Sequence, residues 1–291
     1  MTQFIGVIGY PLKHSVSPDF QQAALDHYKL DIRYEAWEVK AEGLLSTINQ
    51  LRQPQNLGAN ITVPYKETTL HLIDEVDDFA SLVGAVNTIV NRDGKLIGFN
   101  TDAYGFLKAL RDDARFEPEN KRVVNLGSGG AARAVGFALL QEKVSSLIIA
   151  NRTLAKAESL AGALAKYAAN NKMNTDIAAM PWQSSKLTEA VGNCQLIVNC
   201  TSLGMKRSLY EEESPLTSDS IPKDALIYDL VYNPSETPLL RMARGAGANT
   251  IGGLPMLVYQ GAASFKLWTG REAPLDIMYS AAKQALLRTG G

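Results

Sequence analysis

Residues 122–143 read RVVNLGSGGAARAVGFALLQEK. The apolar start predicts a strand, a glycine-rich turn follows, and a helical pattern begins immediately after it. The turn, Gly127-Ser128-Gly129-Gly130-Ala131-Ala132, fits the pattern G-x-G-x-x-A. In such a turn the glycines let the main chain approach a pyrophosphate, and the helix N-terminus supplies free N–H groups. The alternative is a tight turn whose glycines only relieve crowding, but the strand–turn–helix context favours dinucleotide binding.

The end of the next predicted strand, residues 145–153, distinguishes two cofactors. Units that bind NAD usually place an acidic residue there, which holds the ribose 2′-hydroxyl. This chain has Asn151, Arg152 and Thr153, with Lys156 one turn into the following helix. Arg152 offers a planar set of donors to a 2′-phosphate, and Lys156 adds a second positive charge. A solvated helix start is the alternative, but together with the glycine turn these residues favour NADP over NAD.

Outward from this motif, the pattern predicts two α/β units. Before Asp102 we expect an open α/β domain with crossover helices. Its predicted strands cover 3–10, 34–39, 57–63 and 85–91, its predicted helices cover 17–30, 41–52 and 66–76, and a turn is expected at Asp93-Gly94. After Asp102 a second unit of Rossmann type follows, with further strands at 196–199 and 225–232. The tail, 253–270 and 275–288, predicts two helices without a strand between them.

Composition excludes several classes of protein. Hydrophobic residues make up 46% and charged residues 20% of 291 residues, and the formal net charge is −1. These values are typical of a soluble protein, and they do not favour nucleic acid or an anionic membrane as partner. No apolar run is long enough for a membrane-spanning helix, and the start has no pattern of a secretory signal.

Cysteine and histidine usage points the same way. Two cysteines, Cys194 and Cys200, do not make a disulfide framework, and three scattered histidines, His14, His27 and His71, do not make a metal site. We therefore expect a cytoplasmic protein without a metal.

Polar side chains stand at unusual places in the first unit. Ser15 and Ser17 are two residues apart, so in extended chain they share a face, and Ser17 followed by Pro18 reads as the start of a helix. Two hydroxyls beside free N–H groups suit a carboxylate. A plain N-cap is the alternative for Ser17, and it does not exclude ligand contact.

Several predicted strands end in Asn, Thr or Asp. The stretches are Asn60 to Thr62, Asn87-Thr88 and Asn100-Thr101-Asp102. Ligands bind at the carboxyl ends of strands in open α/β sheets, so these side chains predict a polar pocket floor, although any one of them could be a turn or capping residue. Lys66 follows the strand that ends at Pro64. It is either a solvated turn lysine or a group that faces this pocket.

The residues resemble the shikimate dehydrogenase family nearly from end to end. The stretches that carry the resemblance are GYPLKHSVSP, GANITVPYKE, GAVNTI, GFNTDAYGF, NLGSGGAARA, ANRTLAKAESLA, NCTSLGM, DLVYNPSETPLL and GGLPMLVYQGAASFKLWTG. The resemblance implies reversible NADPH-dependent reduction of 3-dehydroshikimate to shikimate, on the route to chorismate and the aromatic amino acids. It implies a substrate-binding and catalytic domain at 1–102, an NADP-binding domain at 103–252, and helices within 253–291 that pack back on the first domain.

The resemblance also assigns roles to residues. Lys66 and Asp102 match the catalytic pair, with a charged Lys66 as proton donor in reduction. The residues that match substrate contacts are Ser15, Ser17, Thr62, Asn87, Asp102, Tyr232 and Gln260. The residues that match the NADP site are Asp78, Gly127, Ser128, Gly129, Gly130, Ala131, Asn151, Arg152, Thr153, Lys156, Met205, Leu230 and Gly253. One departure is that Gln21-Gln22 stands where many members have His-Asn.

Two other readings stay open at this point. A quinate/shikimate dehydrogenase would accept quinate and prefer NAD. Arg152 and the missing acidic residue argue against NAD, but nothing in the chain excludes quinate. A non-catalytic NADP-binding regulatory module would keep the fold, but the presence of Lys66 and Asp102 argues against it. The assembly is expected to be a monomer or a homodimer.

Overall fold

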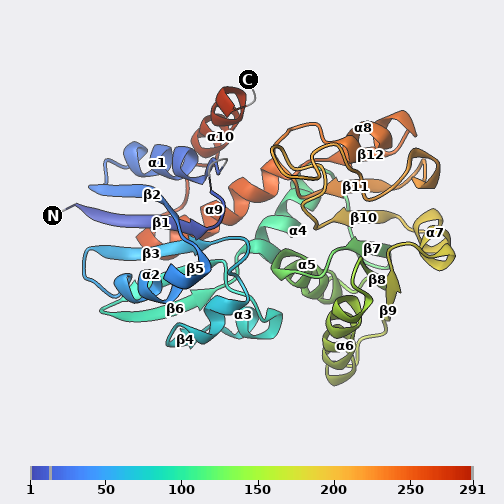
Figure 1. Cartoon of the computed structure of the whole chain (residues 1–291), viewed down its shortest axis with the longest axis horizontal. Coiled ribbons are helices and arrows are strands. Elements are labelled where there is room, and N and C mark those ends of the chain that lie inside the picture. Colours follow the sequence, from blue (N-terminus) through green and yellow to red (C-terminus); the bar gives the residue numbers. More distant parts are fainter. Residues whose placement is uncertain (1, 13–14, 290–291) are drawn as a thin grey trace. The chain divides into compact units, whose positions relative to one another are not determined.

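The computed structural model of the protein describes residues 2–12 and 15–289. Contacts divide the chain into two compact units, which we call the first unit (Met1–Gly105 with Leu257–Gly291) and the second unit (Phe106–Met256). The division falls inside two helices, α4 (Asp102–Asp112) and α9 (Leu254–Thr269). Figure 1 shows the elements of both units in sequence colours.

The first unit contains a six-stranded sheet in the order β2-β1-β3-β5-β6-β4. Its strands are β1 (Gln3–Gly9), β2 (Ile32–Glu38), β3 (Asn56–Ile61), β4 (Glu75–Val76), β5 (Thr88–Arg92) and β6 (Lys95–Phe99). β1 is parallel to both β2 and β3, whereas β5 is antiparallel to β3 and to β6. The predicted turn at Asp93-Gly94 is confirmed, because both residues have a positive φ and join β5 to β6.

Helices cover this sheet. They are α1 (Ser17–His27), α2 (Leu44–Gln50), which follows a 3₁₀ turn at Ala41–Gly43, α3 (Asp78–Val83) and the C-terminal α9 and α10 (Leu275–Thr289). α10 packs against α1, and Figure 1 shows the two side by side although they come from opposite ends of the chain. The return of the C-terminal helices to the first unit is as the resemblance implied.

The helix predicted over 66–76 is wrong. The structure has a 3₁₀ turn at Thr68–His71 and then the short strand β4. The Thr69 hydroxyl donates to the carbonyl of Tyr65 at 2.8 Å, a local bond that competes with helix formation. The Asp74 carboxylate accepts a hydrogen bond from the main chain of Leu96 at 2.7 Å, which ties the segment to the sheet instead.

The second unit contains a fully parallel six-stranded sheet in the order β12-β11-β10-β7-β8-β9. Its strands are β7 (Arg122–Leu126), β8 (Ser146–Asn151), β9 (Asp176–Pro181), β10 (Leu196–Asn199), β11 (Leu226–Asp229) and β12 (Asn249–Ile251). Its helices include α5 (Gly130–Gln141), α6 (Leu154–Asn170), α7 (Ser185–Gly192) and α8 (Pro238–Gly245). This is the strand order of a dinucleotide-binding fold, and it confirms the predicted fold class. The strand order reverses between β7 and β10, although the two strands are parallel.

Sequence analysis did not predict β9 and β12. Both lie at the edges of the parallel sheet, and β12 has only three residues. The central strands β10 and β11 are buried throughout, so they read as continuous apolar runs. β9 is only half-buried, and its DIAAMP sequence carries little strand signal.

Candidate functional site

Lys66 and Asp102 form an ion pair in the first unit. The distance from Lys66 Nζ to Asp102 Oδ2 is 2.6 Å, and the two side chains are 16% and 4% exposed. Lys66 lies in the loop after β3, where Pro64 cannot continue the strand because it has no N–H group. The Lys66 carbonyl accepts a hydrogen bond from the main-chain N–H of Val86 at 2.8 Å, which fixes the loop against the start of β5.

Asp102 is the first residue of α4, and this position stabilises its charge. The partial positive charge at a helix N-terminus favours a carboxylate there. The Asp102 N–H donates to the side chain of Asn100 at 3.0 Å, which closes the turn into the helix. A buried carboxylate needs both a charge partner and hydrogen bonds, and this one has both.

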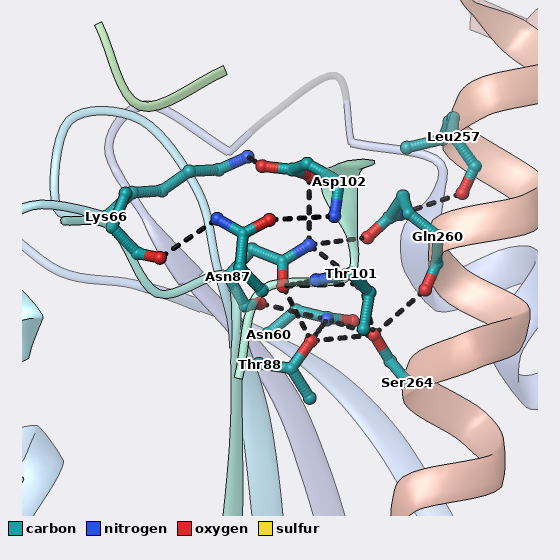
Figure 2. A network of polar contacts seen from close by, with 11 residues as sticks. Asn60, Lys66, Asn87, Thr88, Thr101, Asp102, Leu257, Gln260 and Ser264 are labelled. Atoms are coloured by element: carbon teal, nitrogen blue, oxygen red, sulfur yellow. Dashed lines mark hydrogen bonds and ion pairs between the residues drawn. The ribbon is translucent and has the colours of Figure 1, made fainter. Parts of the chain in front are cut away.

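Asn87 supplies the hydrogen bond on the other carboxylate oxygen. Its amide nitrogen is 2.9 Å from Asp102 Oδ1. The orientation of the amide is fixed, because Asn87 Oδ1 accepts from the main-chain N–H of Thr101 at 2.8 Å. The same amide nitrogen lies 3.2 Å from Gln260 Oε1 on α9. Figure 2 shows these side chains converging from the sheet, from the start of α4 and from α9. The structure therefore brings together Lys66, Asn87, Asp102 and Gln260.

Ser15 and Ser17 lie side by side at the start of α1, but not as predicted. Val16 occupies the N-cap position and Ser17 is the first helical residue, without a side-chain cap, so the N-cap prediction for Ser17 is wrong. Instead, Ser15 Oγ accepts a hydrogen bond from the Ser17 N–H at 3.3 Å. Ser17 is 8% exposed and Ser15 is half-buried. Pro18 therefore lies one position further into the helix than an N-cap at Ser17 would place it.

Two other residues that match substrate contacts, Thr62 and Tyr232, lie in different units. Thr62 is half-buried at the end of β3, and its N–H donates to the Ile8 carbonyl at 2.9 Å. Tyr232 is half-buried and belongs to the second unit. Within residues 2–12 and 15–289, none of the hydrogen bonds of Ser15, Ser17 and Thr62 reaches the Lys66–Asp102 pair.

The glycine turn follows β7 in the second unit. Gly127 has a φ of 113°, which disfavours other residues, and its N–H donates to the Ala150 carbonyl at 2.8 Å. Gly129 is the N-cap of α5, and a Cβ placed there would meet nothing within 4 Å. Ser128 and Ala131 are half-buried on either side. The exposed main chain and the free N–H groups of α5 suit a pyrophosphate, so the residues fit the predicted NADP.

The residues after β8 present positive charge. Asn151 ends β8, and its side chain donates to the carbonyl of Thr153, the N-cap of α6, at 3.0 Å. Arg152 and Lys156 are both exposed. The Arg152 guanidinium carbon is 5.9 Å from the centroid of the Tyr210 ring, a cation–π contact that favours one direction for this long side chain.

The other predicted cofactor residues are in the second unit, except for Asp78, which is in the first. Leu230 and Gly253 are adjacent, because a Cβ on Gly253 would lie 2.1 Å from the Leu230 carbonyl oxygen. Met205 is 41% exposed in the loop after β10. Asp78, in contrast, is exposed at the start of α3 and belongs to the first unit. Its assignment to cofactor contact stays a prediction.

Sequence reasoning missed two polar residues of the first unit and one cluster of the second. Ser264 is fully buried on α9, four residues after Gln260, and this spacing places both on one helix face. The Tyr34 hydroxyl donates to Asn60 Oδ1 at 2.8 Å within the core, and burial raises the pKa of Tyr34 well above its usual value. The spacing between Gln260 and Ser264 was the only sequence signal for Ser264, and Tyr34 had none.

The missed cluster surrounds Asp229 at the end of β11. Burial raises the pKa of the Asp229 carboxyl to about 6, against hydrogen bonds that lower it. The donors are the Thr237 hydroxyl at 2.6 Å, the Asn199 amide at 2.9 Å and the Val231 N–H at 3.1 Å. These bonds shape the chain that leads to Leu230.

The described part of the chain contains neither a candidate metal site nor a candidate membrane span. Within residues 2–12 and 15–289, no group of His, Cys, Asp and Glu is arranged to hold a metal ion. His14 lies outside the described residues. Over the same ranges, none of the helices has both the length and the apolar character to cross a membrane.

Three protein families match successive parts of the chain. The shikimate dehydrogenase substrate binding domain matches residues 7–89, the shikimate / quinate 5-dehydrogenase family matches 112–217, and the shikimate 5′-dehydrogenase C-terminal domain matches 253–283.

Individual relatives match over nearly the whole length. A shikimate dehydrogenase (NADP(+)) of Methanopyrus kandleri is 41% identical over 286 residues, which are 98% of this chain and 96% of that protein. The crystal structure of shikimate 5-dehydrogenase from Thermus thermophilus in complex with NADP(H) and shikimate is 36% identical, with a TM-score of 0.85 and coverage of 97% and 99%. Quinate dehydrogenase from Corynebacterium glutamicum in complex with NAD has a TM-score of 0.85 at 28% identity, with coverage of 97% and 99%. With the family resemblance thus confirmed along its length, the chain belongs to the shikimate dehydrogenase family.

Proposed function

We propose that this protein catalyses the reversible, NADPH-dependent reduction of 3-dehydroshikimate to shikimate, on the route to chorismate and the aromatic amino acids. The observation that carries the proposal is the Lys66–Asp102 ion pair, set among buried amides and hydroxyls in a chain of this family. A regulatory module without catalysis would have no use for such a pair.

Lys66 is the proton donor in this proposal. Reduction of a ketone adds hydride to the carbonyl carbon and a proton to the carbonyl oxygen, and NADPH supplies the hydride when it is bound. The Lys66 ammonium stabilises the negative charge that develops on the oxygen and transfers its proton there. Its side chain is 16% exposed, so the neutral amine formed in this step regains a proton from water. In the oxidation of shikimate the neutral amine accepts the proton.

Asp102 and its neighbours hold the reacting groups in place. Asp102 keeps the Lys66 ammonium at 2.6 Å and accepts a hydrogen bond from a substrate hydroxyl. Asn87, Thr62, Gln260 and Tyr232 bind the remaining hydroxyls and the edge of the ring.

The substrate carboxylate is assigned to Ser15 and Ser17. Both residues lie at the N-terminus of α1, where Ser15 Oγ accepts from the Ser17 N–H at 3.3 Å. The first N–H groups and the partial positive charge of this 11-residue helix favour an anion.

Residues of the second unit hold the cofactor in this proposal. The turn from Gly127 to Ala131 receives the pyrophosphate, and Asn151 to Lys156 receive the adenosine end. Arg152 and Lys156 offer two cations to a 2′-phosphate, and residues 151–157 contain no carboxylate. NADP is therefore the cofactor rather than NAD. Met205, Leu230 and Gly253 are assigned to the nicotinamide end.

The experiment that tests the proposal compares shikimate and quinate, each with NADP⁺ and with NAD⁺, by the absorbance of the reduced nicotinamide. We expect shikimate with NADP⁺ to have the highest kcat/KM. The structure of quinate dehydrogenase with NAD makes quinate with NAD⁺ the relevant competitor, and a higher kcat/KM for that combination would overturn the proposal.

Location and assembly follow as further proposals. A cytoplasmic location is supported by two free cysteines, of which Cys194 is buried and has its pKa raised to about 12 by that burial. Fractionation of the native cells tests this. A monomer or homodimer is expected from light scattering on the purified protein.

A further inference from the structure

Ser264 carries a buried hydroxyl at the centre of the polar cluster behind the ion pair. The residue is 0% exposed, so it cannot contact a substrate in this conformation. Its Oγ is 2.7 Å from the Thr88 hydroxyl, 3.0 Å from the Asn60 amide nitrogen and 3.2 Å from the Thr101 hydroxyl. It lies 3.0 Å from the Gln260 carbonyl, to which it donates one turn back on α9. Figure 2 shows Ser264 projecting from α9 to meet these groups.

The direction of these hydrogen bonds can be worked out. The Tyr34 hydroxyl donates to Asn60 Oδ1, and the Asn60 amide nitrogen faces Ser264 and donates to it. Because the one Ser264 proton goes to the Gln260 carbonyl, the bond between Ser264 and Thr88 takes its proton from Thr88. Ser264 is thus the shared acceptor of the cluster.

The same hydroxyls surround the Asn87 side chain. Asn87 Oδ1 lies 3.0 Å from the Thr88 hydroxyl and 3.2 Å from the Thr101 hydroxyl, in addition to its bond from the Thr101 N–H. This arrangement turns the amide nitrogen of Asn87 towards Asp102 Oδ1, at 2.9 Å, and the Thr101 hydroxyl, at 2.8 Å. Asn60 also holds the main chain of Asn87, because its amide nitrogen is 3.1 Å from the Asn87 carbonyl oxygen. Buried networks of this kind fix one geometry when every member is satisfied.

We propose that Ser264 is a positioning residue for the reaction: it holds Thr88 and Thr101 so that Asn87 keeps Asp102, and through it Lys66, in the reactive geometry. The inference rests on the proposed function of the Lys66–Asp102 pair. Ser264→Ala would remove the acceptor of the Thr88 hydroxyl and of one Asn60 hydrogen, and it would also remove the 3.2 Å contact to the Thr101 hydroxyl. Thr88 and Thr101 would then compete for Asn87 Oδ1, and the aim of the Asn87 amide would loosen.

The matched control is Thr269→Ala on the same helix. The Thr269 hydroxyl donates one turn back to the Phe265 carbonyl at 2.8 Å, as Ser264 does to Gln260, but it takes no part in the cluster. Both changes remove a helical hydroxyl, so a merely structural role predicts a change in melting temperature and no loss of kcat at room temperature for either variant.

The test measures kcat and KM for shikimate and for NADP⁺ in Ser264→Ala, Ser264→Cys and Thr269→Ala, with melting temperatures alongside. We expect Ser264→Ala to lower kcat/KM for shikimate roughly tenfold, mostly in kcat, with KM for NADP⁺ unchanged. Thr269→Ala should keep the parent values. Ser264→Cys keeps a weak donor and acceptor at similar volume, so it should lie between them. If Ser264→Ala does not fold, Thr88→Val removes the other end of the 2.7 Å bond and should show the same loss.

Two results would overturn the inference. One is a kcat for Ser264→Ala within about twofold of the parent enzyme, and the other is an equal loss in Thr269→Ala. A parent enzyme that turns over neither shikimate nor quinate would overturn the proposed function as well, whereas an active parent with an unchanged Ser264→Ala variant would overturn this inference alone.

Discussion

Asn87 and Lys66 contact opposite oxygens of one carboxylate: Asn87 Nδ2 is 2.9 Å from Asp102 Oδ1, and Lys66 Nζ is 2.6 Å from Asp102 Oδ2. Each oxygen therefore has its own donor. The carboxylate cannot rotate without breaking both contacts, and the lysine ammonium is fixed with it. The first two predictions follow from this relationship.

Lys66→Ala should lower kcat for shikimate oxidation by about 10²–10⁴, because it removes the group that exchanges the proton. KM for shikimate should change little, because the interaction is made mainly in the transition state. Steady-state kinetics measure the loss, and calorimetric titration measures binding. Near-normal turnover in a correctly folded variant would return Lys66 to the role of a surface lysine on a turn.

Asp102→Asn should be slow and should also bind shikimate more weakly, since it loses an acceptor and the charge that fixes Lys66. The informative measurement is the double variant with Lys66→Ala. If the two residues act as one unit, the combined loss will be far smaller than the product of the single losses. Multiplying losses would mean that the two side chains act independently.

Arg152→Ala should weaken NADP⁺ at least tenfold and leave NAD⁺ almost unchanged. A charge-assisted contact to a phosphate contributes about 1.5–3 kcal/mol, which corresponds to this factor. Fluorescence titration with both cofactors checks the prediction without turnover. Arg241→Ala, a substitution at another exposed arginine of the second unit, serves as the control for loss of charge alone. An equal effect on both cofactors would place Arg152 away from the 2′-phosphate.

Asp229 should make the protein less stable as the pH rises from about 4 to about 6. Burial raises the pKa of its carboxyl to about 6 in the folded state from an ordinary value of 3.8. Between these values the folded state keeps a proton that the unfolded state has released, so the free energy of unfolding falls as pH rises. Above both pKa values the shift lowers the free energy of unfolding by about 3 kcal/mol, and below both values this loss is absent.

Denaturant unfolding at several pH values tests this in the parent protein and in Asp229→Asn. The difference in unfolding free energy, parent minus variant, should decrease across that range and stay constant above it. Asp219→Asn, at an exposed position of the same unit, controls for general effects of removing a carboxylate. A difference that does not depend on pH would contradict the prediction.

Gly253→Ala should destabilise the protein and weaken NADP⁺. A Cβ at this position would lie 2.1 Å from the Leu230 carbonyl oxygen, and a main-chain atom cannot move away cheaply. Gly245, the last residue of α8, is the control, because a Cβ there meets nothing within 4 Å. Gly245→Ala should raise the stability by about 0.5–1 kcal/mol through the higher helix propensity of alanine. Thermal unfolding separates the two outcomes.

The sequence predicted the fold class because both units carry strong local signals. The glycine turn and the buried apolar strands of the second unit are readable without tertiary contacts, and the Asp93-Gly94 turn has chemistry of its own. The helix expected over 66–76 failed because the segment satisfies its polar groups locally and against the sheet, through Thr69 and Asp74, which no helical periodicity reveals.

The candidate site was predictable only in part. Lys66 and Asp102 follow strand ends, where polar residues are informative. Asn87 instead comes just before β5, and it reaches the same edge of the sheet because β5 runs antiparallel to β3. Ser264 reaches Asn60 only because α9 returns to the first sheet, and Tyr34 reaches the same side chain from another strand of that sheet. Asp229 escaped notice because its partners Asn199 and Thr237 come from different elements.

The division of the chain has a consequence for folding during synthesis. All of the second unit, Phe106–Met256, is present before the last segment of the first unit leaves the ribosome. Until then the β3–β5 region lacks Ser264 and also Trp268, whose indole N–H donates to the Ile89 carbonyl at 2.8 Å. The second unit can therefore complete its core first. The residues up to Gly105 lack some of their hydrogen-bond partners until the C-terminal helices are synthesised. The cluster around Lys66 and Asp102 is among the last parts of the molecule to form, so a truncated chain would retain the second unit without an ordered Lys66–Asp102 pair.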